Sequence, residues 1–153
     1  MAIPNGNAAE LQTYKLTAAQ KNAVDQIKSL VGPRGYVSKM DEMEPHLVDW
    51  RGVYRGNAEL VCYPINTKEV SDIVKICSAA MMPIVPQGGN TSMCGGSVPL
   101  KNSASIILNL SRMNKIRYLD KNNYTMTVEA GCVLQKLQQL ASDSDRYFPL
   151  SLA

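Results

Sequence analysis

The stretch Leu60–Pro86, LVCYPINTKEVSDIVKICSAAMMPIVP, carries the pattern that decides the fold. Apolar runs at 60–63 and 83–86 predict two short buried strands. A helix is expected between them from Thr67, because apolar residues recur on one helical face. These residues are Val70, Ile73, Val74, Cys77, Ala80 and Met81. A strand, a helix and a strand this close together are typical of a βαβ unit, so we expect two parallel strands joined by a right-handed crossover.

The segment that follows, PQGGNTSMCGGSVP (Pro86–Pro99), combines four glycines with small polar residues and shows no helical period. It leaves the carboxyl end of a predicted parallel strand, which is the edge where open α/β sheets bind ligands. Gly88 and Gly89 permit positive φ and lack a Cβ, so successive backbone N–H groups can form an anion nest. We therefore predict a phosphate or diphosphate cradle in this segment.

Two better-known phosphate motifs do not fit this segment. It has no GK[ST] ending, which excludes a Walker A loop, and no GxGxxG opens a helix. No Lys or Arg lies inside 87–96, so the expected cradle is built from backbone geometry alone. A glycine-rich surface turn without a ligand is the alternative that this pattern leaves open.

The rest of the chain completes an α/β pattern. Downstream we expect a strand at 104–110, a hairpin of 115–119 and 124–130, and an amphipathic helix that starts near Val133. Upstream, Thr17 is a plausible N-cap for a first helix that ends at Gly32-Pro33, and 35–56 is expected to be an irregular connection. The predicted organisation is a flexible arm (1–15), a helix with its connecting segment (16–56) and a ligand-binding portion (57–153).

Composition narrows the function classes. The chain has 153 residues with 45% hydrophobic and 19% charged residues, which excludes wholesale disorder. The net charge of +3 is spread along the chain and gives no reason to expect nucleic acid as a partner. The chain contains no run of 18 apolar residues, so we expect no transmembrane segment. Four cysteines without a CxxC, and a single histidine, do not supply a zinc site, and we expect reduced thiols in the cytosol.

For single residues with reactive, charged or aromatic side chains, we favour structural or surface roles over catalytic ones. His46 is expected to be hydrogen-bonded or at the surface, and Cys94 to be a small residue tolerated in a turn. Glu129 lies on the polar face of a strand and is expected to be solvated. Trp50 is expected to be a packing anchor. Arg51 and Arg55 are expected to be a surface pair, with contact to phosphate as the alternative.

Four sequence blocks together resemble a known family. They are Pro86–Pro99, the segment from Asp49 to Gly56, the segment from Pro64 to Val70, and EAGC (Glu129–Cys132) followed by a helix and FPLSLA. This chain is similar to the FAD-binding (PCMH-type) domain of vanillyl-alcohol-oxidase-type flavoproteins, and most of all to FAD-linked D-2-hydroxy-acid dehydrogenases. The resemblance implies an N-terminal βαβ subdomain, the start of a second mixed sheet, and an N-terminal fragment of a longer protein.

The resemblance also implies which residues hold FAD. In that family this loop wraps the pyrophosphate with backbone amides, and Gly131 lets the backbone pass the cofactor. The implied cofactor-binding residues are Pro86, Gln87, Gly88, Gly89, Asn90, Thr91, Ser92, Gly95, Gly96, Ser97, Gly131, Pro149, Leu150 and Ser151. Relatives with covalent flavin place a histidine where Asn90 stands, so we expect noncovalent FAD. No residue of this chain is assigned a catalytic or metal-binding role.

The implied function is the FAD-binding part of an oxidoreductase that oxidises a D-2-hydroxy acid of the D-2-hydroxyglutarate, D-lactate or glycolate type. The substrate would be held by a further domain, and an electron-acceptor partner is expected. The isolated chain is expected to be inactive. The alternative is a non-catalytic nucleotide-binding or interaction module from a truncated gene.

Overall fold

The predicted βαβ unit forms, and a later strand lies between its two strands. The computed structural model describes residues 14–150. Its first sheet has the order β1-β2-β4-β3, with β2 (Ala58–Cys62) and β3 (Ile84–Gln87) each parallel to β4 (Ser105–Asn109). The helix α3 (Thr67–Ala79) connects β2 to β3, and β1 (Tyr36–Val37) pairs antiparallel with β2. The strands 60–63 and 83–86 are therefore parallel as expected, but they are not neighbours.

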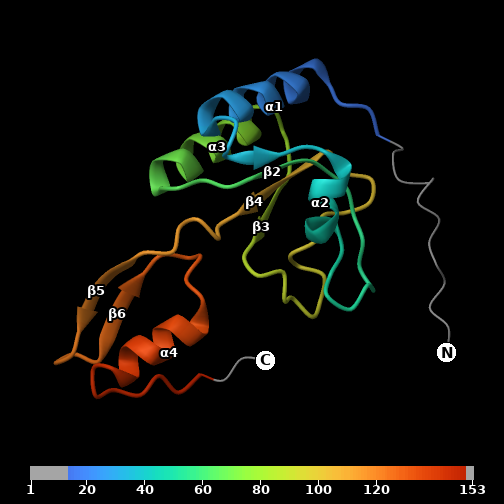
Figure 1. The fold of residues 1–153 in the computed structure, drawn as a ribbon. Coiled ribbons are helices and arrows are strands. Elements are labelled where there is room, and N and C mark those ends of the chain that lie inside the picture. The colour runs from blue at the N-terminus through green and yellow to red at the C-terminus, as the bar shows by residue number, and fades with distance from the viewer. Residues whose placement is uncertain (1–13, 151–153) are drawn as a thin grey trace, which may run out of the picture.

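Helices cover both faces of this sheet because the strand residues alternate between two cores (Figure 1). On one face, Leu60 and Ile106 pack with α1 (Ala18–Val31) and α3. On the other face, Val61 and Ile107 pack with α2 (Met40–Leu47). The strand β4 is buried along its whole length, which is why its sequence, SIILN, is apolar at three successive positions.

The first helix forms as its end signals predict. Thr17 is the N-cap and forms a capping box with Gln20, whose backbone N–H donates to the threonine hydroxyl at 3.2 Å. The helix ends at Gly32, which has φ of +69°. Just before the helix, the Tyr14 hydroxyl donates to Glu59 Oε1 at 2.8 Å, so this end of the predicted arm is attached to β2; residues 1–13 lie outside the described residues.

The expectation of an irregular connection at 35–56 is wrong. This segment contains β1 and the helix α2. The negative charges of Asp41 and Glu42 in the first turn interact favourably with the helix dipole. Met43 and Leu47, four residues apart, lie on the same helix face and are buried. Pro45 lies inside the helix and removes one backbone N–H donor. A proline at such a position normally argues against a helix in the sequence, but this helix of eight residues forms despite the lost hydrogen bond.

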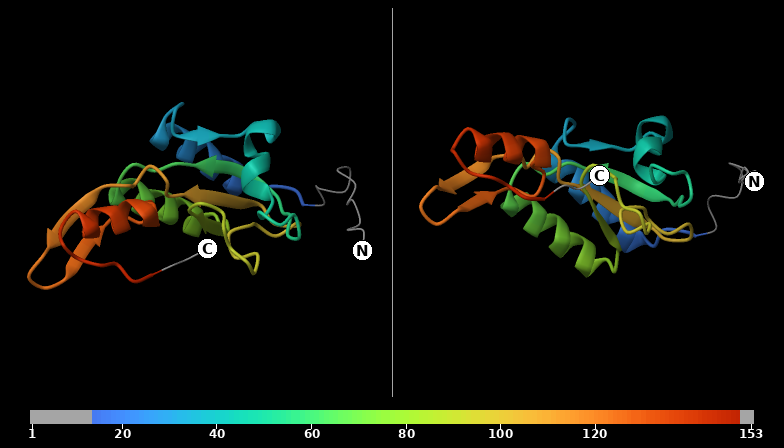
Figure 2. Two further views of the ribbon diagram at one scale, coloured as in Figure 1. Left: turned by 60° about the horizontal axis from the view of Figure 1, so that its bottom comes forward. Right: turned by 90° about the horizontal axis from the view of Figure 1, so that it is seen from below.

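The second part of the chain is a small antiparallel hairpin with a helix beside it (Figure 2). Strands β5 (Ile116–Asp120) and β6 (Thr125–Val128) pair antiparallel, and α4 (Leu134–Ser142) follows. The Asp120 carboxylate accepts from the backbone N–H of Asn122 and of Asn123, both at 3.0 Å, and so closes the turn. This is the expected start of a second sheet. The domain boundaries proposed at 15/16 and 56/57 stay predictions.

The four cysteines divide into two buried and two accessible thiols, and this division gives a prediction. Burial raises the pKa of Cys62 to about 12 and of Cys77 to about 11, whereas Cys94 is exposed and Cys132 is half-buried. A thiol reagent at pH 8 should therefore modify Cys94 first, and should reach Cys62 and Cys77 only after unfolding. Mass spectrometry of labelled peptides measures this order. Rapid native labelling of Cys62 would contradict the core described above.

Candidate functional site

The glycine-rich loop, residues 88–97, is held at both ends by one buried side chain. Gln87, the last residue of β3, is 2% exposed. Its amide Nε2 donates to the carbonyl of His46 at 3.0 Å and to the carbonyl of Ser97 at 2.9 Å. Gln87 therefore joins the start of the loop to its exit and to α2. This side chain has no donor left for a ligand.

The geometry around His46 settles which ring nitrogen carries the proton. His46 Nδ1 lies 2.5 Å from Gln87 Oε1, which can only accept, so Nδ1 is the donor. Nε2 then faces the Tyr63 hydroxyl at 2.8 Å. As expected, His46 is hydrogen-bonded, and it links α2, the loop and the end of β2.

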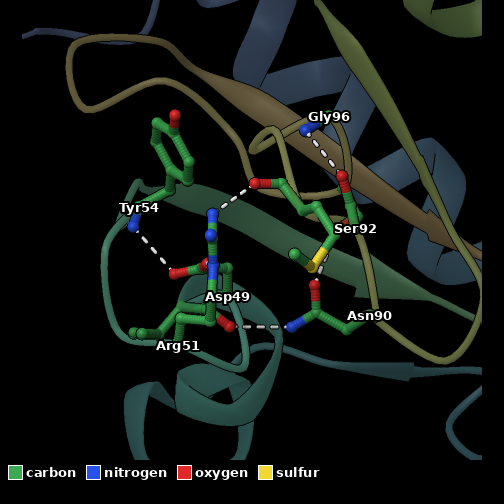
Figure 3. A network of polar contacts seen from close by, with 9 residues as sticks. Asp49, Arg51, Tyr54, Asn90, Ser92 and Gly96 are labelled. Atoms are coloured by element: carbon green, nitrogen blue, oxygen red, sulfur yellow. Dashed lines mark hydrogen bonds and ion pairs between the residues drawn. The ribbon is translucent and has the colours of Figure 1, made fainter. Parts of the chain in front are cut away.

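Asn90 attaches the middle of the loop to α2. Its Nδ2 donates to the carbonyl of Val48 at 2.7 Å and to that of Pro45 at 3.1 Å, while Oδ1 accepts from the Ser97 hydroxyl at 2.7 Å. Asn90 also has φ of +55°, a left-handed conformation that asparagine tolerates. All of its side-chain polar atoms are therefore used inside the protein (Figure 3).

The loop leaves backbone donors without protein acceptors. Within residues 14–150, the N–H groups of Gly88, Gly89, Asn90, Thr91 and Ser92 donate to no acceptor of the chain. The sheet uses the other side of these peptides, because the Gln87 carbonyl accepts from the Leu110 N–H at 2.9 Å and the Gly88 carbonyl from Asn109 Nδ2 at 3.4 Å. In a trans peptide the N–H points opposite to the C=O, so the N–H groups of Gly88 and Gly89 point away from β4.

These free donors at the carboxyl end of parallel strands fit an anionic group such as a diphosphate. Gly88 fits it too, because a Cβ built there would meet nothing within 4 Å and would project into the space outside the loop. Gly88 and Gly89 could adopt positive φ, but neither does so in this structure. Positive φ falls instead on Asn90 and on Gly95, where a Cβ would lie 2.9 Å from the Tyr54 ring.

The other implied cofactor residues lie in three places. Pro86, Thr91 and Gly96 are exposed and Ser92 and Ser97 are half-buried, all on or beside the loop. The Ser92 hydroxyl accepts from the Gly96 N–H at 3.1 Å, which closes a small turn. Pro149 and Leu150 are exposed in the segment that follows α4, and Ser151 lies outside the described residues. Their assignment to FAD stays a prediction.

Gly131 has a structural explanation that differs from passage of a cofactor. A Cβ there would lie 2.0 Å from the carbonyl oxygen of Leu110 and 2.9 Å from that of Met113. Its N–H donates to the Met113 carbonyl at 2.8 Å. Glycine is needed here because the backbone after β6 crosses the backbone after β4.

The sequence interpretation missed a charged pair beside the loop. Arg51 Nη2 donates to the carbonyl of Met93 inside the loop, and Arg51 Nε lies 3.6 Å from Asp49 Oδ2 (Figure 3). Burial raises the pKa of the Asp49 carboxyl, but backbone N–H donors from Tyr54 and Val53 and the Arg51 charge outweigh it. The pKa of Asp49 is therefore lowered. Asp49 stays ionised under Arg51. Arg55 instead pairs with Glu44, so the two arginines are not one surface pair.

Two further expectations fail near the sheets. Trp50 is 61% exposed and is no packing anchor; its ring lies 6.0 Å from the Arg51 guanidinium. Glu129 is buried rather than solvated, because its carboxylate accepts from the Lys115 N–H at 2.9 Å and from Arg117 Nη2 at 3.2 Å. Alternation along β6 placed it on the polar face, but a residue just past the strand end no longer follows that alternation.

Comparison with known proteins finds relatives of this chain in sequence. Proteins similar in sequence include a probable mitochondrial D-2-hydroxyglutarate dehydrogenase of Oryza sativa subsp. japonica, 39% identical over 129 residues, and the Arabidopsis thaliana enzyme, 36% identical over 129 residues. Each alignment covers 84% of this chain and 23% of the relative, so the chain spans about a quarter of their length. A putative mitochondrial D-lactate dehydrogenase of Schizosaccharomyces pombe is 32% identical over 145 residues and covers 90% of this chain and 27% of that protein.

Solved structures share the fold. p-Cresol methylhydroxylase aligns with a TM-score of 0.75 at 23% identity, covering 90% of this chain and 27% of that one. Alkyldihydroxyacetonephosphate synthase aligns with a TM-score of 0.72 at 18% identity, covering 94% of this chain and 27% of that one. At these identities the likeness concerns the fold alone.

The structure and the relatives bear on two predictions, the absence of a transmembrane segment and the cytosolic location. No helix among residues 14–150 is long and apolar enough to cross a membrane. The relatives named above are described as mitochondrial, so they give no support to a cytosolic location, which stays a prediction.

The family model described as FAD binding domain matches residues 58–153, from β2 through the loop and the second sheet to the last residue. This match covers more than half of the chain and includes the free amides of the loop. The chain therefore belongs to the FAD-binding domain family, and FAD is its cofactor.

Proposed function

We propose that this chain is the FAD-binding part of an oxidoreductase that acts on a D-2-hydroxy acid, of the D-2-hydroxyglutarate or D-lactate type. The observation that carries the FAD site is the run of N–H groups from Gly88 to Ser92 that have no acceptor among residues 14–150, next to the carboxyl ends of β3 and β4. The names of the similar dehydrogenases support the substrate class. When bound, FAD supplies the acceptor for the hydride removed from the substrate.

Some residues of the chain contact the cofactor and others position the loop that binds it. The amides of Gly88–Ser92 bind the diphosphate, and Gln87 and Asn90 hold the loop in place from inside. Asn90 uses its amide on the carbonyls of Pro45 and Val48, so it offers the flavin no side-chain attachment, in support of noncovalent FAD. The substrate and the electron acceptor are proposed to bind outside this chain's described residues.

Replacing Gly88 by valine tests the site, because a Cβ at Gly88 meets no protein atom within 4 Å and the added bulk lies next to the amides proposed to bind the diphosphate. We expect the affinity for FAD to fall roughly tenfold or more, since bulk between the amides and the phosphate removes charge-assisted hydrogen bonds. The free energy of unfolding should change by only about 0.5 kcal/mol, as at a typical surface position. FAD titration and denaturant unfolding measure the two quantities.

Thr127→Val is the matched control, because Thr127 is exposed on β6, away from the loop. It should leave FAD affinity unchanged. Equal FAD affinity in Gly88→Val and wild type would contradict the diphosphate assignment. Tight binding of FAD without oxidation of D-2-hydroxyglutarate or D-lactate by the protein as its gene encodes it would retain the cofactor site and remove the proposed substrate class.

A further inference from the structure

The loop that binds the diphosphate carries no positive side chain of its own. The residues from Gly88 to Gly96 include no lysine or arginine. A diphosphate is an anion, and backbone N–H groups supply only partial charges. In the part of the chain that the structure describes, the cationic side chain hydrogen-bonded to this loop is Arg51, through the carbonyl of Met93.

Arg51 is held where it is by a buried anion. The Asp49 side chain is fully buried, and its Oδ1 accepts from the Tyr54 N–H at 2.8 Å. Its Oδ2 lies 3.6 Å from Arg51 Nε and has no hydrogen-bond partner among the described residues. An ionised oxygen without a hydrogen bond is costly to bury, so the positive charge of Arg51 is what compensates it. The Asp49–Arg51 pair is therefore fixed by the fold of the 49–54 turn.

The contact with Met93 determines the direction of one loop peptide. Because the Met93 carbonyl faces Arg51, the N–H of Cys94 in the same trans peptide points away from it. Arg51 thus holds the second half of the loop, as Asn90 holds its middle. The Arg51 side chain is one-third exposed, so its charge also reaches the solvent beside the loop.

We propose that Arg51 is a positioning residue for FAD: anchored on Asp49, it fixes the Met93–Cys94 peptide and supplies the positive charge beside the diphosphate-binding amides. This inference rests on the proposed FAD site and goes beyond it, because it assigns the charge that the loop lacks to a residue of the α2–β2 connection. A structural surface ion pair would instead affect stability without affecting FAD affinity.

Arg55 provides a matched control. It lies four residues further along the same connection and donates to Glu44 Oε2 at 2.7 Å, with a second bond to Oε1. Both of these acceptor atoms belong to Glu44 on α2, not to the loop. Arg51→Gln and Arg55→Gln remove the same charge from the chain, so a general effect of net charge on FAD binding would appear equally in both.

The experiment measures FAD dissociation constants for wild type, Arg51→Gln, Arg51→Lys and Arg55→Gln, in the protein as its gene encodes it. We expect Arg51→Gln to weaken FAD binding roughly tenfold or more and to flatten its salt dependence. Arg51→Lys should recover part of the affinity, because lysine keeps the charge but cannot bridge Met93 and Asp49 in the same way. Arg55→Gln should bind FAD within about threefold of wild type.

Failure of this inference is distinguishable from failure of the FAD site. Wild-type protein that does not bind FAD overturns the proposed function. Wild-type protein that binds FAD while Arg51→Gln binds equally well overturns only the role of Arg51. If Arg51→Gln does not fold, Arg51→Lys decides. An affinity between those of wild type and Gly88→Val, with the wild-type salt dependence, supports the role of Arg51. Full wild-type affinity overturns the positioning of the Met93–Cys94 peptide, and an affinity as low as that of Gly88→Val overturns the charge role.

Discussion

Replacing Gly56 by alanine is expected to lower the free energy of unfolding by about 3 kcal/mol, the upper range for forcing bulk into a packed site. Gly56 is buried, and a Cβ there would lie 1.6 Å from the carbonyl oxygen of Pro99 and 2.4 Å from its carbonyl carbon. Both neighbours are backbone, so no flexible side chain can move aside. The exit of the glycine-rich loop must shift as a unit.

Denaturant unfolding of Gly56→Ala measures this loss, and Gly88→Ala is its matched control. The chemical change is the same, but the Cβ at Gly88 meets no protein atom within 4 Å. Gly88→Ala should therefore leave the free energy of unfolding within about 0.5 kcal/mol of wild type. Equal stability of Gly56→Ala and wild type would show that the Pro99 backbone is free to move away.

Replacing Asn90 by alanine is expected to cost about 2–4 kcal/mol of unfolding free energy and most of the FAD affinity. The change removes three hydrogen bonds, leaves the carbonyls of Pro45 and Val48 without this donor, and places alanine at φ of +55°. The loop would no longer be attached to α2 at its middle. Unfolding and FAD titration on the same preparation measure both effects.

Asn90→Gly separates the backbone strain from the lost amide. Glycine adopts the left-handed conformation without strain, so this variant should be more stable than Asn90→Ala by about 1 kcal/mol. It should still bind FAD poorly, because it lacks the contacts to Pro45 and Val48. Wild-type FAD affinity in Asn90→Gly would show that the amide does not position the loop.

The sequence predicts the parts of this fold that depend on local periodicity. The stripe from Val70 to Ala80 gives α3, and the apolar runs give β2, β3 and β4, because a buried face repeats at a fixed spacing. The order β2-β4-β3 is not visible in such patterns. The order depends on which strands pair with each other over long distances in the sequence, and local residue patterns do not specify this pairing.

The candidate loop could be found from its glycines and its place after a strand, but its supports could not. Gln87 and Asn90 read as ligand donors in sequence, whereas the structure uses their amides on the chain's own carbonyls. Arg51 lies 42 residues before its partner Met93, so only the tertiary fold brings the charge to the loop. Pro45 inside α2 also made this helix hard to predict from the sequence, although Asn90 of the loop donates to the Pro45 carbonyl.

The central place of β4 has a consequence for synthesis on the ribosome. Both β2 and β3 emerge from the exit tunnel before β4. β1 can already pair with one edge of β2, but the edges of β2 and β3 that pair with β4 have no partner until residues 105–109 follow. For that interval the nascent chain displays apolar strands such as Leu60–Cys62 to its surroundings, which is the situation that holding chaperones relieve. A translational pause before residues 105–109 have left the tunnel would thus favour misassembly, and a pause after they have left it would not.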